Sequence, residues 1–188
     1  SSILISGQTG TGKTLFLISM IKGLLEKGEK CVMFNFEESR EKILLKARTW
    51  DVDLEKAEEE GIFRLWCTYP ESQGIEELIV DMKDLIESFK PNRVFIDSIS
   101  ALTRITTEVS YRQSLINLIL LFREKNIIGF LTSTSPTFAS PLLSSEEHIS
   151  TLSDAIILLR YFERDGKLSR GFSVIKLRGS DHTKYFIE

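Results

Sequence analysis

Short apolar runs typical of β-strands alternate along this chain with longer segments in which apolar residues recur at helical spacing. The strand-type runs lie at residues 2–6, 31–36, 62–67, 93–97 and 127–133. The segments with helical spacing lie at residues 14–27, 38–50, 73–88 and 108–125. Strands that alternate with helices in this way predict an α/β fold, in which helices flank a mostly parallel central sheet.

The pattern changes after residue 133. Residues 134–153 hold two of the four prolines and many hydroxyl side chains, so we expect a loop there. Two further strand-type runs follow at residues 155–162 and 171–178, and between them the Asp-Gly pair at 165–166 is typical of a hairpin turn. We therefore expect a β-hairpin as a C-terminal extension of the central sheet.

Composition narrows the class of protein. The 188 residues suffice for one domain, with 42% hydrophobic and 27% charged residues. The formal net charge of -3 gives no electrostatic argument for a nucleic-acid or membrane surface. No apolar run approaches the ~18 residues that span a bilayer, and no signal-peptide pattern is visible, so we expect a cytoplasmic protein. Cys31 and Cys67 have apolar neighbours, which favours buried, reduced thiols.

The first strand-type run leads into GQTGTGKT at residues 7–14. Gly7, Gly12, Lys13 and Thr14 match the phosphate-binding pattern G-x-x-x-x-G-K-[ST], between a strand and a helix as the motif requires. Glycines allow the backbone amides to surround a phosphate, the lysine reaches the β- and γ-phosphates, and the threonine hydroxyl binds Mg²⁺. The alternative is a glycine-rich turn that only caps a helix, and motif and context together favour the nucleotide site.

Three acids at the ends of strand-type runs are candidates for Mg²⁺ binding or catalysis. Asp97 ends the run 93–97, at the sheet edge where ligands of α/β folds bind, so we expect it near Mg²⁺. Its alternative role is to cap the next loop. Glu37 and Glu38 follow the run 31–36, where one of them can deprotonate or orient the attacking oxygen. Acids also favour the first turn of a helix. We favour Glu37 as the catalytic residue and Glu38 as its support.

With these residues in place, the chain resembles the RecA-like ATPases and, within them, the KaiC family. The segments that carry the resemblance are GQTGTGKT at 7–14, FNFEESR at 34–40, YPES at 69–72, FIDSISAL at 95–102, HISTLSD at 148–154 and KLRGSDH at 176–182. The phosphate loop alone is common to many NTPases, whereas the other segments in this order and spacing are specific. HIST makes the chain more similar to the second, autokinase-type repeat of the family than to the first.

The resemblance implies a RecA-like P-loop NTPase fold and roles for the matching positions. Since family members carry two such domains, residues 1–188 would be one domain excised from a longer chain, which would explain a start without Met directly on a strand. Phosphates would be enclosed by Thr9, Gly10, Thr11, Gly12, Lys13, Thr14 and Leu15. Thr14 and Glu37 would lie near Mg²⁺, with Glu37 as the general base, and Trp50 would lie against the nucleotide.

The resemblance also implies contacts between subunits of a hexameric ring. The nucleotide of a neighbouring subunit would be approached by Arg170, Lys176, Leu177, Arg178, Ser180, Asp181 and His182. Ser150 and Thr151 would be the phosphate acceptors. Asp181 stands where the family pattern commonly has an aromatic residue, which implies a looser contact at that position.

The residues alone leave other interpretations open. Basic residues are common on edge strands, so without the resemblance Arg170 and Lys176 would indicate a solvated strand edge. Trp50 would be a core or helix-end aromatic. Thr151 begins the pattern T-x-x-D, which is typical of a helix cap, and other hydroxyls in the same loop, such as Ser144, are competing acceptors.

The leading functional hypothesis is an ATP- and Mg²⁺-dependent serine/threonine autokinase with ATPase activity, in a homohexamer with nucleotide at each interface. Its partners would be regulatory clock or signalling proteins. A KaiC-like ATPase switch without kinase activity is the first alternative, and a nucleotide-gated assembly module without turnover is another. A RecA-type DNA-dependent ATPase is disfavoured, because the chain is acidic and has no evident basic, aromatic-rich loop.

Overall fold

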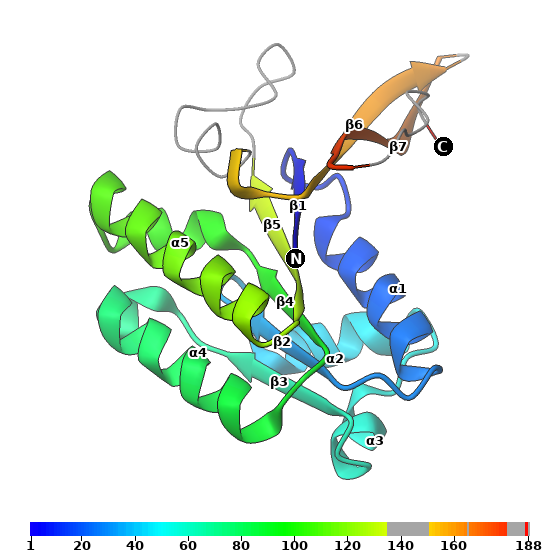
Figure 1. Cartoon of the computed structure of the whole chain (residues 1–188). Helices are drawn as coiled ribbons and strands as arrows, with labels where there is room; N and C mark the ends of the chain where they lie inside the picture. The colour runs from blue at the N-terminus through cyan, green and yellow to red at the C-terminus, as the bar shows by residue number, and fades with distance from the viewer. Residues whose placement is uncertain (135–150, 165, 180–186, 188) are drawn as a thin grey trace.

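The computed structural model describes residues 1–134, 151–164, 166–179 and 187. The described residues form a sheet of seven strands in the order β3-β2-β4-β5-β1-β6-β7 (Figure 1). The strands are β1 (Ser2–Gly7), β2 (Cys31–Asn35), β3 (Phe63–Cys67), β4 (Arg93–Asp97), β5 (Ile128–Thr134), β6 (Ala155–Arg164) and β7 (Lys167–Leu177). Every pair of neighbours is parallel except β6 and β7, which form an antiparallel hairpin. The predicted α/β sheet and C-terminal hairpin are therefore confirmed.

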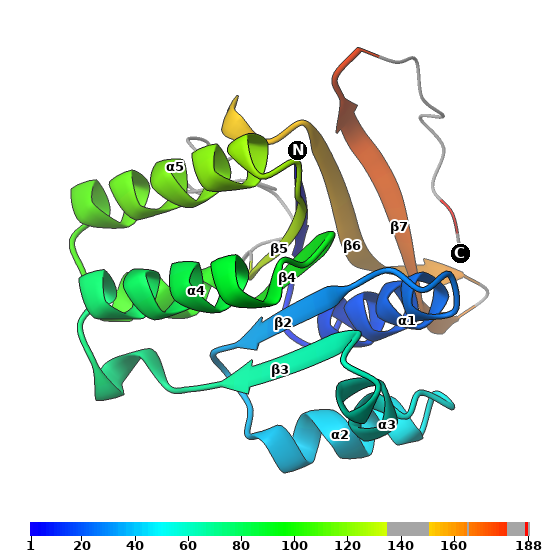
Figure 2. The same ribbon diagram turned by 60° about the horizontal axis from the view of Figure 1, so that its bottom comes forward.

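Helices cover both faces of this sheet. The α-helices are α1 (Lys13–Leu25), α2 (Arg40–Arg48), α3 (Leu54–Glu59), α4 (Ile75–Phe89) and α5 (Glu108–Glu124), and two 3₁₀ helices are η1 (Pro70–Ser72) and η2 (Ile99–Arg104). Figures 1 and 2 show α4 and α5 together on one face and α1, α2 and α3 on the other. None of the described helices is long and apolar enough to cross a membrane.

The two layers bury two separate sets of side chains. Along β4, Val94 and Ile96 pack into the cluster under α4 and α5, whereas Phe95 packs into the cluster under α1, α2 and α3. The Phe95 ring is stacked on the Phe130 ring of β5, with centroids 4.8 Å apart and planes 9° from parallel. A strand buried on both faces must be apolar at successive positions, which explains why the strand-type runs were recognisable in the sequence.

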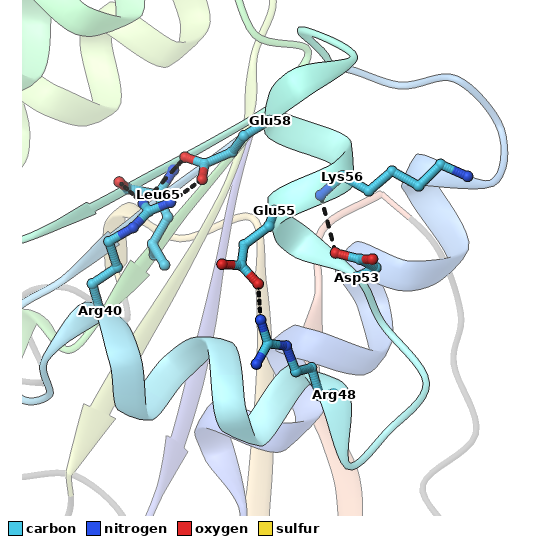
Figure 3. Close-up of polar contacts among 7 residues, drawn as sticks. All are labelled: Arg40, Arg48, Asp53, Glu55, Lys56, Glu58 and Leu65. Carbon is cyan, nitrogen blue, oxygen red and sulfur yellow. Dashed lines mark hydrogen bonds and ion pairs between the residues drawn. The ribbon is translucent and has the colours of Figure 1, made fainter.

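Ion pairs hold α2 and α3 together and against β3 (Figure 3). Arg40 pairs with Glu58, and Arg48 pairs with Glu55. Arg40 Nη1 also donates a hydrogen bond to the Leu65 carbonyl at 3.2 Å, and the Leu65 N–H donates to Glu58 Oε1 at 2.9 Å. Because α2 begins just after the two candidate glutamates of the sequence FNFEES, these contacts fix the segment that carries them.

The hairpin strands are longer than predicted. The ladder continues to the pair of Arg164 and Lys167, so only residues 165 and 166 lie between the strands. The outer part of β6 and β7 is exposed and mostly polar, and backbone hydrogen bonds there form without apolar residues facing a core. An apolar pattern could not reveal these residues as strand.

Both cysteines are free thiols, as predicted; Cys31 is buried, whereas Cys67 is only partly buried. Burial raises the pKa of Cys31 to about 12 and that of Cys67 to about 11. The thiolate is the reactive form, so we expect iodoacetamide at pH 8 to modify both cysteines slowly in the folded chain. In denaturant, both should react about as fast as a free cysteine. Mass spectrometry over time measures this, and rapid modification of the folded chain would contradict the burial of these thiols.

Candidate active site

The sequence GQTGTGKT forms the loop between β1 and α1, at the carboxyl edge of the parallel strands. Gly10 and Gly12 have φ angles of 84° and 96°, in the left-handed region that favours glycine. Gly12 is the N-cap of α1, so the first backbone amides of this helix face the loop. The predicted strand, loop and helix are all present, and the helix N-terminus favours an anion there.

Lys13 is folded back into the loop and is only 8% exposed. Its Nζ donates hydrogen bonds to the carbonyls of Gly7 and Gln8, at 2.8 and 3.0 Å. The Lys13 ammonium group can therefore exchange one of these carbonyl contacts for a contact with a phosphate oxygen at the helix N-terminus.

Asp97 is the centre of a buried hydrogen-bond network at the end of β4. Thr14 Oγ1 donates to Asp97 Oδ2 at 2.6 Å, Thr132 Oγ1 donates to Oδ1 at 2.6 Å, and Asn35 Nδ2 lies 3.3 Å from Oδ2. Burial raises the pKa of the Asp97 carboxyl, and the hydrogen bonds from Thr132 and Thr14 oppose that shift. A cation beside Thr14 would favour the ionised carboxylate.

Glu37 and Glu38 differ in what their carboxylates contact. Both backbone N–H groups donate to Asn35 Oδ1, at 3.0 and 2.7 Å, so one amide side chain fixes the turn out of β2. The Glu37 carboxylate accepts a hydrogen bond from Ser98 Oγ at 2.8 Å. The Glu38 carboxylate is paired with Lys46 Nζ at 2.5 Å. Glu38 is therefore neutralised by a cation, whereas Glu37 has a neutral partner.

A cavity of about 350 Å³ lies over the loop. The predicted residues that line it are Thr9, Gly10, Gly12, Lys13, Thr14, Leu15, Glu37, Glu38, Asp97 and Arg170. A second cavity, of about 600 Å³, shares Thr9, Glu37 and Thr134 with the first. Glu37 thus lies where the two cavities meet.

Sequence reasoning missed several residues of the site. Lys46 and Thr134 line the first cavity, and Asn35, Thr132 and Ser98 position the acids. A signal existed for Lys46, which lies eight residues after Glu38 on a predicted helix and so leans back towards it. Polar residues near the ends of apolar strands, such as Asn35, were a second signal.

The other predicted residues are not gathered at this cavity. Trp50 is 46% exposed at the end of α2, and its carbonyl accepts a hydrogen bond from Lys22 Nζ at 3.1 Å, beside the later turns of α1. The role of Arg170 at a neighbour's nucleotide stays a prediction; within this chain it lines the chain's own cavity. Lys176 and Leu177 lie at the far end of β7.

The remaining predictions concern the acceptor and the last basic segment. Arg178 N–H donates to the Asp154 carbonyl at 2.8 Å, and Arg178 Nη2 donates to the carbonyl of Thr151, which is exposed. Ser150, Ser180, Asp181 and His182 lie outside the described residues.

The donor set fits Mg²⁺ bound together with a nucleotide. The described residues contain no group of three or more His, Cys, Asp or Glu side chains that could hold a metal. Mg²⁺ commonly needs only one or two protein oxygens, because phosphates and water supply the others. Thr14 Oγ1 and the Asp97 carboxylate, which are in contact beside the loop, match that requirement.

Comparison with known proteins identifies the family of this chain. The family model described as "ATPase: KaiC" matches residues 1–188. Circadian clock protein KaiC3 of Synechocystis sp. is 46% identical over 98% of this chain and 36% of its own length. Circadian clock oscillator protein KaiC is 40% identical in Acaryochloris marina and 41% in Thermosynechococcus vestitus, over 98% of this chain in both and over 35% and 36% of the relatives. The chain thus spans about a third of the length of these relatives. It belongs to the KaiC family of ATPases and has the family's RecA-like P-loop fold.

Proposed function

We propose that this chain binds Mg-ATP and transfers the γ-phosphoryl group to a serine or threonine hydroxyl of a second copy, in a hexameric ring. The observation that carries the proposal is the position of Glu37, between the cavity over the phosphate loop and the adjoining cavity. A base at that junction can take a proton from an oxygen that enters through the second cavity and attacks a phosphate held in the first.

Each group around the loop has a part in this transfer. The amides of residues 10–15 and Lys13 would hold the phosphates. Arg170, which lines the cavity over the loop, would add positive charge there. Thr14 and Asp97 would hold Mg²⁺, which would neutralise charge on the phosphate oxygens. Glu37 accepts the proton of the attacking hydroxyl as its oxygen bonds to the γ-phosphorus, while the bond to the β-phosphate oxygen breaks and ADP leaves. The Glu38 carboxylate stays ion-paired with Lys46.

The fold favours transfer between copies over transfer to Thr151 of the same chain. Asp154 Oδ2 accepts hydrogen bonds from Ser1 Oγ and Ser2 N, at the start of β1, and Arg178 joins this end to Thr151. The phosphate loop follows the other end of β1, about 17 Å away along a six-residue strand. Figure 2 shows residues 151–154, which directly precede β6, near the N-terminus and away from the start of α1. This separation supports an acceptor that is supplied by another copy.

Mixing two inactive variants tests this arrangement. One chain carries Glu37→Gln and keeps its acceptors; the other carries Ser150→Ala and Thr151→Ala and keeps its base. With Mg-ATP, we expect neither alone to be phosphorylated in the peptide 148–154, and we expect the Glu37→Gln chain to gain phosphate there when the two are mixed. Intact mass and peptide mapping distinguish the chains, and a Ser144→Ala, Ser145→Ala chain is the matched control.

The same experiment separates the alternatives. Phosphate on the wild-type chain only outside residues 148–154 would overturn the choice of acceptors. Steady release of inorganic phosphate without labelled protein would favour an ATPase that switches a partner, with water as the attacking oxygen. Since the similar proteins are named as circadian clock proteins, regulatory clock or signalling proteins are the partners that we propose for either activity.

A further inference from the structure

One side chain of the hairpin is bonded directly to the phosphate loop. Tyr161, on β6, donates its hydroxyl to the Gly10 carbonyl at 2.6 Å, across 151 residues of sequence. A Cβ atom at Gly10 would lie 2.8 Å from this hydroxyl oxygen. A side chain at residue 10 would therefore displace the Tyr161 hydroxyl, and the φ angle of 84° itself favours glycine there.

This hydrogen bond fixes a peptide unit that the nucleotide would use. The Gly10 carbonyl and the Thr11 N–H belong to the same planar peptide unit and point in opposite directions. Holding the carbonyl on Tyr161 therefore sets the direction of the Thr11 N–H. That N–H donates a long hydrogen bond to the Gln8 carbonyl, at 3.3 Å, which a phosphate oxygen can replace.

The same rung of the hairpin carries a cation. Tyr161 and Arg170 are opposite each other in the β6–β7 ladder, and the Arg170 guanidinium lies over the Tyr161 ring, 5.7 Å from its centroid. Arg170 Nη1 lies 3.9 Å from the place that a Cβ of Gly12 would occupy. The hairpin thus approaches Gly10 with a hydroxyl and Gly12 with a guanidinium.

We propose that Tyr161 is a positioning residue: its hydroxyl holds the Gly10–Thr11 peptide in the orientation that binds phosphate, and so couples nucleotide binding to the β6–β7 hairpin. The inference rests on the proposed nucleotide binding. It predicts that a nucleotide in the loop slows hydrogen exchange of the hairpin backbone and that this protection depends on the Tyr161 hydroxyl.

Three variants test it. Tyr161→Phe removes the hydroxyl and keeps the ring under Arg170; Tyr161→Ala removes both. Leu168→Ala, on β7 of the same hairpin and 71% exposed in the wild type, is the matched control. The measurements are the Kd of Mg-ADP by calorimetry, and hydrogen exchange of the peptides over 7–14 and the hairpin, without nucleotide and at saturation.

We expect Tyr161→Phe to weaken Mg-ADP binding about three- to tenfold, as the loss of one hydrogen bond predicts. At saturating nucleotide the variant should lose the protection of the hairpin that the wild type gains. Leu168→Ala should match the wild type in both measurements. Wild-type affinity and wild-type protection in the Tyr161→Phe variant would overturn the inference. An effect seen only in Tyr161→Ala would also overturn it, because that effect would then come from the ring.

Failure of the proposed function gives a different result. A wild-type chain that does not bind Mg-ADP would overturn nucleotide binding itself. Faster exchange of the 7–14 peptide in nucleotide-free Tyr161→Phe, with an unchanged thermal midpoint, would still support the positioning contact, because that measurement needs no ligand.

Discussion

Replacing Glu37 with glutamine is expected to lower the rate of phosphoryl transfer by about 10²- to 10⁴-fold, with little change in the affinity for Mg-ATP. The amide cannot take the proton from the attacking oxygen, but it keeps the size of the side chain and an oxygen that accepts from Ser98. Single-turnover phosphate release and protein labelling measure the rate, and calorimetry measures the affinity.

Glu38→Gln is the matched control, because it makes the same change one residue later. The Glu38 carboxylate is bound by Lys46, so we expect its loss to reduce the rate far less. A larger fall in rate for Glu38→Gln than for Glu37→Gln would assign the base to Glu38. Equal falls would show that the two acids act as a unit.

The second large effect is on stability. Phe95→Ala should lower the free energy of unfolding by about 3–5 kcal/mol, the usual cost of deleting a buried aromatic ring. Phe95 is fully buried and stacked on Phe130, so the ring leaves a cavity between the sheet and α1. Such a loss is a large part of the stability of an ordinary domain. Urea unfolding followed by circular dichroism measures it.

Val109→Ala is the comparison for this variant. Val109 is 79% exposed on α5, so its truncation should change the free energy of unfolding by less than about 0.5 kcal/mol. A cost below about 1 kcal/mol for Phe95→Ala would contradict the packing described for the face that carries α1. Because Asp97 follows two residues later on the same strand, the variant should also bind nucleotide less tightly.

The local patterns of the sequence were sufficient to predict the sheet and the phosphate loop. The strand β2 is buried at every position, and its first four residues form a continuous apolar run. GQTGTGKT is a contiguous motif. The outer hairpin was predicted too short because its charged residues pair only through the backbone. Nothing in an apolar pattern reports that kind of pairing.

For the site, the sequence identified the residues with distinctive chemistry but not the residues that position them. Lys13, Thr14 and Asp97 each stand at a motif or a strand end. Asn35 and Thr132 reach Asp97 only because the strands pair in one register, in which Asn35 is opposite Asp97. Register joins residues that are far apart in sequence, so spacing along the chain could not reveal it.

The pairings of Asp97 also determine when the site can exist during synthesis of the protein. Its partners Thr14, Asn35 and Thr132 are 83, 62 and 35 residues away in sequence. Contacts of such long range form late in folding, because distant segments must first meet. A growing chain on the ribosome therefore cannot complete this network before Thr132 has emerged. Nucleotide that binds the finished site, at 100 times its Kd, would then add about 2.7 kcal/mol to the stability of the folded state.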